Sequence, residues 1–268
     1  MVRNNMIGLL ALATVVMMVS GAQAVQFNAI GDSYSQDFNS LISTDGDSAT
    51  FVDDSTIASW WVNSEEMDSN SDEYFAEDGS STGGEVYSFG ADENSDRALG
   101  YLGSGGNDYF NAAVKLENNT GSVINEILVG YTGEQWRSGG DSGDNQNSLV
   151  VSYQVFNSGA GSVPADTDQA GWTVASSLEF TPPQPNVSAG AMDGNAAANR
   201  TVFSPTSLSG LNWADGQELW LRFSGGDGAG SDAGLGIDDL SVSTIPEPGT
   251  ISLLLAGLIG LVGVRRRK

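Results

Sequence analysis

The strongest constraint on the fold is the alternation of short apolar stretches with turns rich in Gly, Asp, Asn and Ser. Each apolar stretch has the length of a strand and contains many β-branched and aromatic residues. These stretches occur at residues 58–63, 84–90, 109–118, 123–131, 148–156, 217–225 and 235–243. No segment between them keeps a helical spacing, and the chain has 35 glycines. The pattern predicts one all-β domain, an antiparallel β-sandwich of jelly-roll type.

The alternation within the stretches indicates which side chains face the core. Within residues 110–116 the even-numbered positions are all apolar, and within 219–223 the odd-numbered positions are. Trp220 and Arg222 therefore point away from the core. Residues 149–156 are apolar on both faces, which favours a central strand.

Residues 1–24 have the features of a secretory signal peptide. Arg3 precedes an apolar run from Ile7 to Val19, and the small residues Ala22 and Ala24 complete an A-x-A cleavage site. We therefore expect a signal helix, export by the general secretion machinery, and cleavage by signal peptidase between Ala24 and Val25. A buried N-terminal helix or an uncleaved anchor is the alternative, but the apolar run is short for a membrane span.

The charge of the chain excludes several partners. All 34 acidic residues lie between positions 25 and 247, against five basic residues, so this part has a net charge near −29. The five basic residues are Arg97, Lys115, Arg137, Arg200 and Arg222. Nucleic acids and anionic membrane surfaces would be repelled by such a body.

Cys and His are both absent from the sequence. Their absence excludes disulfides, a Ser-His-Asp triad, a Cys nucleophile and a zinc site built from imidazole or thiolate. Ser33 lies in a GDSYS segment that resembles an esterase nucleophile block, but it has no His to accept its proton. Two carboxylates could still hydrolyse a glycosidic bond, although no spacing singles out such a pair. We therefore expect a protein that is not an enzyme.

No motif requires a cofactor, and calcium is the one that suits the acidic loops. Residues 140–147 and 225–234 offer oxygen ligands on Gly-rich loops, although neither has the spacing of an EF-hand. Asp238 and Asp239 follow each other in a predicted strand, so only one of them points inward. A buried carboxylate there needs a cation or backbone donors, which makes these aspartates a speculative calcium site.

Trp60 and Trp61 are neighbours in one predicted strand. Consecutive strand residues point to opposite faces, so at most one of the two rings lies in the core. The other ring is either covered by a loop or available to stack against a sugar.

The last residues of the chain form three consecutive parts. Pro246, Glu247 and Pro248 give a stiff, non-helical spot, and an apolar run extends from Thr250 to Val264. A helix over that run spans roughly 22 Å, short of the ~30 Å hydrocarbon core. The basic residues that follow favour the cytoplasmic side of the membrane; they are Arg265, Arg266, Arg267 and Lys268. Such a segment suits a single, temporary transmembrane sorting helix.

This tail resembles the PEP-CTERM sorting signal of Gram-negative bacteria that make exopolysaccharide. The motif, the apolar run and the basic cluster occur in the same order over residues 245–268. The resemblance implies recognition by an exosortase, a membrane-embedded protease, with Pro246, Glu247 and Pro248 as recognition residues. It also implies a transient inner-membrane anchor, followed by transfer to the cell surface or extracellular matrix.

The body, residues 25–244, is similar to one found in many proteins with this tail. The similar segments are 34–41, 87–105, 128–137 and 234–242, in the same order. The resemblance implies a β-sandwich rather than an activity. Arg97, Glu134 and Arg137 match its recurring polar positions, and we expect buried structural ion pairs among them.

Three hypotheses for the function follow. The leading one is a non-enzymatic protein of the cell surface or matrix that is sorted by an exosortase. The second is a carbohydrate-binding module for the exopolysaccharide. The third is a glycan hydrolase that uses two carboxylates.

Overall fold

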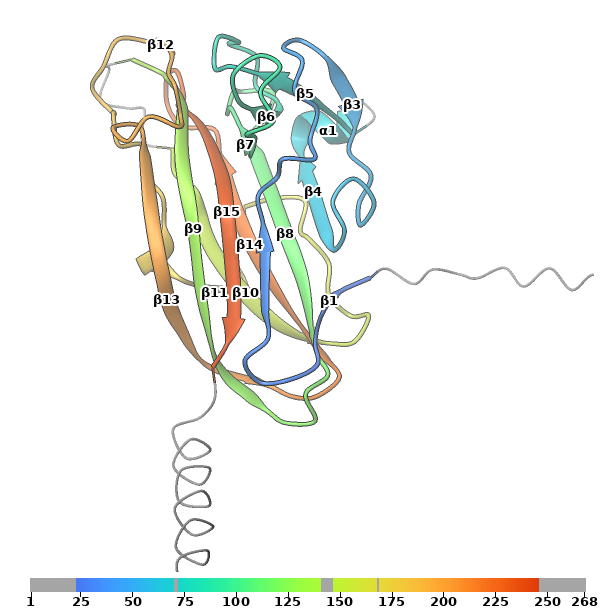
Figure 1. Ribbon diagram of the computed structural model, residues 1–268. Coiled ribbons are helices and arrows are strands. Elements are labelled where there is room, and N and C mark those ends of the chain that lie inside the picture. Colours follow the sequence, from blue (N-terminus) through green and yellow to red (C-terminus); the bar gives the residue numbers. More distant parts are fainter. Residues whose placement is uncertain (1–22, 70–71, 141–146, 168, 246–268) are drawn as a thin grey trace, which may run out of the picture.

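Two β-sheets packed face to face form the body in the computed structural model (Figure 1). The structure describes residues 23–69, 72–140, 147–167 and 169–245. The six-stranded sheet contains β1 (Val25–Phe27), β4 (Trp60–Ser64), β8 (Tyr109–Asn118), β10 (Val150–Asn157), β11 (Thr173–Val174) and β14 (Gln217–Gly226). The nine-stranded sheet contains β2 (Ser33–Gln36), β3 (Ser48–Thr50), β5 (Glu73–Glu77), β6 (Val86–Phe89), β7 (Ala98–Tyr101), β9 (Ile124–Ser138), β12 (Gly190–Ala191), β13 (Arg200–Trp213) and β15 (Gly234–Thr244). A short helix, α1 (Glu65–Ser69), and a 3₁₀ turn, η1 (Ser176–Leu178), complete the described elements.

The strand order confirms the predicted all-β sandwich. The prediction that all strands are antiparallel is wrong. The six-stranded sheet has the order β1-β8-β14-β10-β11, with β4 also paired to β8. The nine-stranded sheet has the order β12-β9-β15-β7-β6-β5-β3, with β13 on β9 and β2 on β15. Two pairs, β1–β8 and β5–β6, are parallel. Parallel neighbours need a long connection, and the many residues between β1 and β8 supply one for the first of these pairs.

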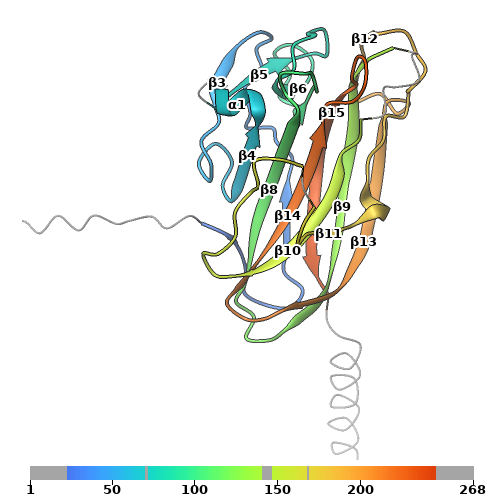
Figure 2. The same cartoon turned by 180° about the vertical axis from the view of Figure 1, so that it is seen from behind.

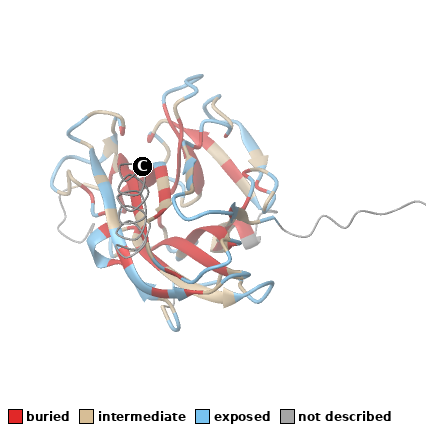
Figure 3. Ribbon diagram, turned by 60° about the horizontal axis from the view of Figure 1, so that its bottom comes forward, coloured by how far each residue is buried: buried red, intermediate tan, exposed pale blue. Residues whose placement is uncertain are grey.

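The core lies between the two sheets, where the buried residues gather (Figure 3). The even-numbered positions 110–116 of β8 and the odd-numbered positions 219–223 of β14 are fully buried in it, as their alternation predicts. β10 lies between β14 and the two-residue strand β11, so it is central for only a small part of its length.

The 14-residue strand β13 is not evident from the sequence. It pairs with β9 alone and carries mostly exposed residues, so it lacks the apolar face that identifies a strand. Its pairing shifts between Phe203 and Thr206, where Pro205 intervenes. A proline and an irregular register on an edge strand prevent pairing with further chains.

The first and last described strands lie at the two ends of the body in sequence. β1 begins at Val25, and β15 ends at Thr244, at the end of the sandwich opposite β5, β6 and β12 (Figure 1). The expected signal helix with Ala22, and the sorting helix from Thr250 to Val264, lie outside the described residues. Within the part of the chain that the structure describes, no helix is long and apolar enough to cross a membrane.

Candidate carbohydrate site

The two adjacent tryptophans of β4 point to opposite faces of the six-stranded sheet. Trp60 is fully buried, stacks 6.4 Å from Phe223 and donates from Nε1 to the Tyr34 hydroxyl at 2.8 Å. Trp61 lies on the outer face and is only partly buried. The expectation that at most one of these rings lies in the core is confirmed.

On the outer face, Trp61 and Trp220 enclose a buried cation. Their ring centroids are 4.8 Å apart, at an interplanar angle of 46°. The Lys115 ammonium lies 4.7 Å from the Trp61 ring centroid and 6.0 Å from that of Trp220. The sheet register explains this grouping, because Trp61 pairs with Ala113, and Trp220 pairs with Lys115 two residues further along β8.

Glu218 balances the charge of Lys115. The two groups lie 4.0 Å apart, and both side chains are less than a tenth exposed. Glu218 also accepts hydrogen bonds from Trp220 Nε1 at 3.1 Å and from the backbone N–H of Gly159 at 2.9 Å. The lysine and the glutamate therefore fix the orientation of the aromatic pair from below.

A pocket of about 240 Å³ opens beside this pair, and we call it the Trp61 pocket. It is lined by Asp53, Trp61, Val62, Asn63, Gly161, Ser162, Val163 and Trp220. Asp53 is held at the pocket by the backbone N–H of Val62, which donates to Oδ1 at 3.1 Å. Partial burial of its carboxyl, together with the nearby Asp72 and Asp54, raises the pKa of Asp53. The pocket thus combines an indole surface with a carboxylate and an amide.

Residues 158–167, which we call the roof segment, pass over the outer face of this sheet, across β8 and towards β4 (Figure 2). Asn63 Nδ2 and Asn111 Nδ2 each donate to the Pro164 carbonyl at 3.1 Å, and Asn111 Nδ2 also lies 2.9 Å from the Asp166 carbonyl. Gly161 lies so close to Trp220 that an added Cβ would be 2.2 Å from the indole Nε1. The roof segment covers Trp220 and leaves Trp61 at the pocket.

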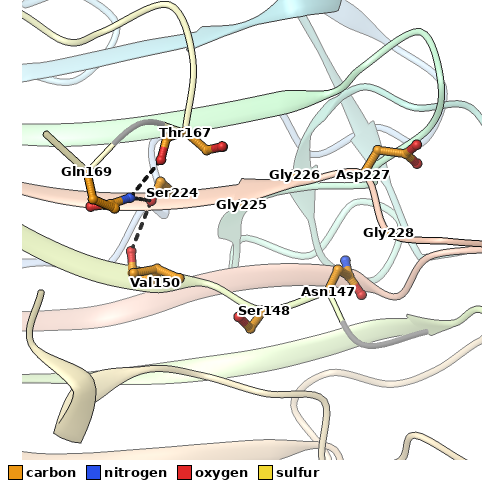
Figure 4. A pocket seen from close by; sticks show the side chains of 10 residues that line it. All are labelled: Asn147, Ser148, Val150, Thr167, Gln169, Ser224, Gly225, Gly226, Asp227 and Gly228. Carbon is orange, nitrogen blue, oxygen red and sulfur yellow. Dashed lines mark hydrogen bonds between the residues drawn. The ribbon is translucent and has the colours of Figure 1, made fainter. Parts of the chain in front are cut away.

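A second pocket, of about 320 Å³, lies further along the same face (Figure 4). It is lined by Asn147, Ser148, Val150, Thr167, Gln169, Ser224, Gly225, Gly226, Asp227 and Gly228. Gln169 Nε2 donates to the Thr167 carbonyl at 2.9 Å and to Ser224 Oγ at 3.2 Å. No aromatic ring lines it, so it offers hydrogen bonds without a stacking surface.

The two residues of the predicted calcium site, Asp238 and Asp239, lie in different environments. Asp238 is buried, whereas Asp239 is exposed and adopts a φ of +50° where the pairing of β15 with β9 shifts. Asp238 Oδ1 accepts from the Asp239 backbone N–H at 2.7 Å, and burial raises the pKa of Asp238 to about 8. Among the described residues, the group of acids close enough to share a cation is a different one, Asp45 with Glu77 and Asp78. A calcium site at Asp238 and Asp239 stays a prediction.

Arg97, Glu134 and Arg137 have other partners than the expected ion pairs. The Arg97 guanidinium donates to Ser88 Oγ at 2.9 Å, to the Ala91 carbonyl at 3.0 Å and to the Ser88 carbonyl. Arg137 Nη1 donates to the Gly79 carbonyl at 2.9 Å. Both arginines therefore hold loops through backbone carbonyl groups. In the described part of the chain, no ion pair joins either of them to Glu134.

Glu134 lies in a second, smaller apolar cluster on the outer face of the nine-stranded sheet. This cluster consists of Tyr87, Phe89, Ala98, Leu102 and Trp136. Trp136 Nε1 donates to Glu134 Oε2 at 2.9 Å, whereas Glu134 Oε1 is buried and has no hydrogen-bond partner among the described residues. Burial raises the pKa of Glu134 to about 7, so its neutral form persists to a higher pH than that of an ordinary carboxyl group.

The comparison with protein families concerns the end of the chain. Residues 244–268 match the model of the PEP-CTERM protein-sorting motif. The chain carries a PEP-CTERM sorting motif. This motif implies export, membrane anchoring and processing by an exosortase. Within it, Pro246, Glu247 and Pro248 lie outside the described residues, as do the basic residues that end the motif.

Several solved structures match the body at low identity and with TM-scores below 0.5. TmCBM61 in complex with β-1,4-galactotriose is 10% identical, with a TM-score of 0.32, over 69% of this chain and 88% of that chain. The K3 cleaved adhesin domain of Lys-gingipain from Porphyromonas gingivalis is 14% identical, with a TM-score of 0.34; the match covers 73% of this chain and 98% of that domain. The family 11 carbohydrate-binding module from Clostridium thermocellum is 12% identical, with a TM-score of 0.28; the match covers 76% of this chain and 99% of that module. No curated protein matches the chain in sequence.

Sequence reasoning predicted that one of Trp60 and Trp61 lies outside the core, but it did not indicate which one or the residues that complete the site. Lys115, Glu218 and Asp53 come from three distant segments, and nothing local in the sequence connects them. The one available signal was alternation, which places Trp220 and Lys115 on the outer faces of their strands.

Proposed function

We propose that this chain is a non-enzymatic protein of the cell surface or extracellular matrix that binds a carbohydrate. In this proposal, signal peptidase cleaves before Val25 and an exosortase removes the tail. The Trp61 pocket then binds one sugar ring of a glycan such as an exopolysaccharide.

The composition of the Trp61 pocket is the observation that carries this proposal. A sugar ring has an apolar C–H face and an edge of hydroxyl groups, so it needs an aromatic surface with hydrogen-bonding groups beside it. Trp61 supplies the surface, and Asp53 and Asn63 supply the polar groups. The volume of about 240 Å³ lies below the ~300–1,000 Å³ that drug-sized ligands occupy, which suits a single ring.

The same pocket favours binding over hydrolysis. Glycosidases of either stereochemistry generally require two carboxyl groups on opposite sides of the scissile bond. Of the residues that line the pocket, Asp53 alone carries a carboxyl group. The proposal therefore assigns recognition, without cleavage, to this site.

We expect Trp61→Ala to weaken glycan binding at least about thirtyfold, because a central aromatic anchor contributes about 2 kcal/mol or more. The full chain, purified in detergent, is first screened on a glycan array, and the best ligand is then titrated by calorimetry. Trp172→Ala is the matched control, because Trp172 is partly buried next to Arg222 and does not line the pocket. Equal losses in both variants, or no binding by the wild type, would refute a sugar site at Trp61.

Processing of the tail is tested separately. We expect Glu247→Ala, or deletion of residues 265–268, to leave an uncut precursor in the membrane fraction, because each change removes a part of the sorting motif. Immunoblots of membrane and extracellular fractions measure this, with Asp215→Ala in an exposed turn as the control. Normal removal of the tail in both variants would contradict exosortase sorting.

A further inference from the structure

Negative charge predominates around the Trp61 pocket. Asp53 lies at its mouth, and the carboxylates of Asp54 and Asp72 are close enough to act on it electrostatically. Among the described residues, no Arg or Lys lines the pocket. Asp53 Oδ1 accepts the Val62 N–H, and Oδ2 accepts no hydrogen bond from the described residues, so this oxygen can receive one from a ligand.

Lys115, which contacts Trp61 and Trp220, does not offset the negative charge of Asp53. Lys115 lies beneath Trp61 and Trp220, is 5% exposed and pairs with Glu218. Because the lysine and the glutamate balance each other, the net charge presented to a ligand is that of Asp53. The large negative charge of the body, near −29, acts in the same direction.

We propose that the Trp61 pocket selects a sugar ring with a free, protonated amine and excludes rings that carry a carboxylate. This inference rests on the proposed carbohydrate binding and adds the chemical class of the sugar. The ammonium donates a charge-assisted hydrogen bond to Asp53, which is about twice as strong as a neutral one. The C–H face of the same ring packs on Trp61. A uronate ring would place its carboxylate beside Asp53, where like charges repel.

Three trisaccharides of the same length test the inference: one of glucosamine, one of N-acetylglucosamine and one of glucuronic acid. The full chain in detergent is titrated with each at pH 6, and quenching of tryptophan fluorescence is measured. We expect the glucosamine trisaccharide to bind about tenfold more tightly than the acetylated one, and the glucuronic acid trisaccharide to show no measurable binding.

Two aspartate variants separate a local contact from the general attraction of an acidic protein for a cation. Asp53→Asn should reduce the preference for the free amine to about twofold, because it weakens binding of the glucosamine trisaccharide far more than binding of the acetylated one. Asp37→Asn is the matched control, because Asp37 is also exposed and also accepts a backbone N–H, from Asn39 at 3.2 Å. It should keep the tenfold preference.

The outcomes distinguish this inference from the function on which it rests. Equal preference in the two aspartate variants, or tight binding of the glucuronic acid trisaccharide, would overturn the selection of an amine while leaving a sugar site at Trp61 in place. Binding that Trp61→Ala leaves unchanged would overturn both.

Discussion

The free energy of unfolding should be several kcal/mol higher at pH 5 than at pH 8. Two buried carboxyl groups on the outer face of the nine-stranded sheet contribute to this difference, together with Glu85 and Asp232, whose pKa values burial raises to about 7. Burial raises the pKa of Glu134 to about 7 and that of Asp238 to about 8, against ordinary values of 4.5 and 3.8. The nearby Asp96 and Asp239 raise both pKa values further, and Arg200 opposes the effect on Glu134.

The sign follows from the protons bound in each state. Between pH 5 and pH 8 both carboxyl groups are ionised in the unfolded chain, while the folded protein keeps them protonated at the lower end of this range. The folded state therefore binds more protons, and its stability falls as the pH rises towards the folded pKa values. A difference of two pH units corresponds to about 3 kcal/mol for each such group.

The measurement is urea unfolding of the full chain at pH 5, 6, 7 and 8. Glu134→Gln with Asp238→Asn should remove about half of the pH dependence, because burial also raises the pKa values of Glu85 and Asp232 to about 7. Asp37→Asn with Asp215→Asn removes two exposed charges instead and should leave the dependence nearly intact. If both double variants reduce the slope equally, the dependence comes from the overall negative charge and not from these buried groups.

Lys115→Met should destabilise the body by about 3–5 kcal/mol, because it leaves Glu218 buried without its cation. For a domain of this size we expect the melting temperature to fall by about 10 °C. Both indole rings that contact Lys115 also lose a cation–π partner, so glycan binding at Trp61 should weaken as well.

A second substitution shows whether the buried charge is the cause. Adding Glu218→Gln to Lys115→Met removes the unpaired carboxylate but keeps an acceptor for Trp220 Nε1 and for the Gly159 N–H. We expect the double variant to recover most of the lost stability in thermal melts. Arg200→Met, which removes an exposed charge, should change the stability by less than about 1 kcal/mol. A double variant as unstable as Lys115→Met would point to lost packing instead.

The core strands could be predicted from the sequence because their core-facing positions are all apolar, whereas the alternate positions include polar and charged residues. In β8 and β14 one face lies in the core, and the alternation of Phe110 to Leu116 and of Leu219 to Phe223 predicted this face correctly. Residues on the other face, such as Lys115 and Arg222, are buried as well. β13 could not be recognised in this way. As an edge strand it has little apolar surface to bury, and its serines, Pro205 and Gly210 interrupt any alternation of apolar and polar residues.

The candidate site was only partly predictable, because pairing between strands is not local. The neighbours Trp61 and Trp220 are far apart in the chain and meet only because β4 and β14 both pair with β8. The arginines show a different limit. A base in a chain with so few of them suggests a carboxylate partner, but Arg97 and Arg137 donate hydrogen bonds to backbone carbonyl groups instead.

The central claim is that Trp61 and Asp53 form a sugar site on an exported β-sandwich. A crystal structure of the protein with a bound oligosaccharide tests it most directly. The account predicts one sugar ring stacked on the Trp61 indole, with a polar group of that ring within hydrogen-bond distance of an Asp53 oxygen. A sugar bound at another surface, with the Trp61 pocket filled only by water, would contradict it.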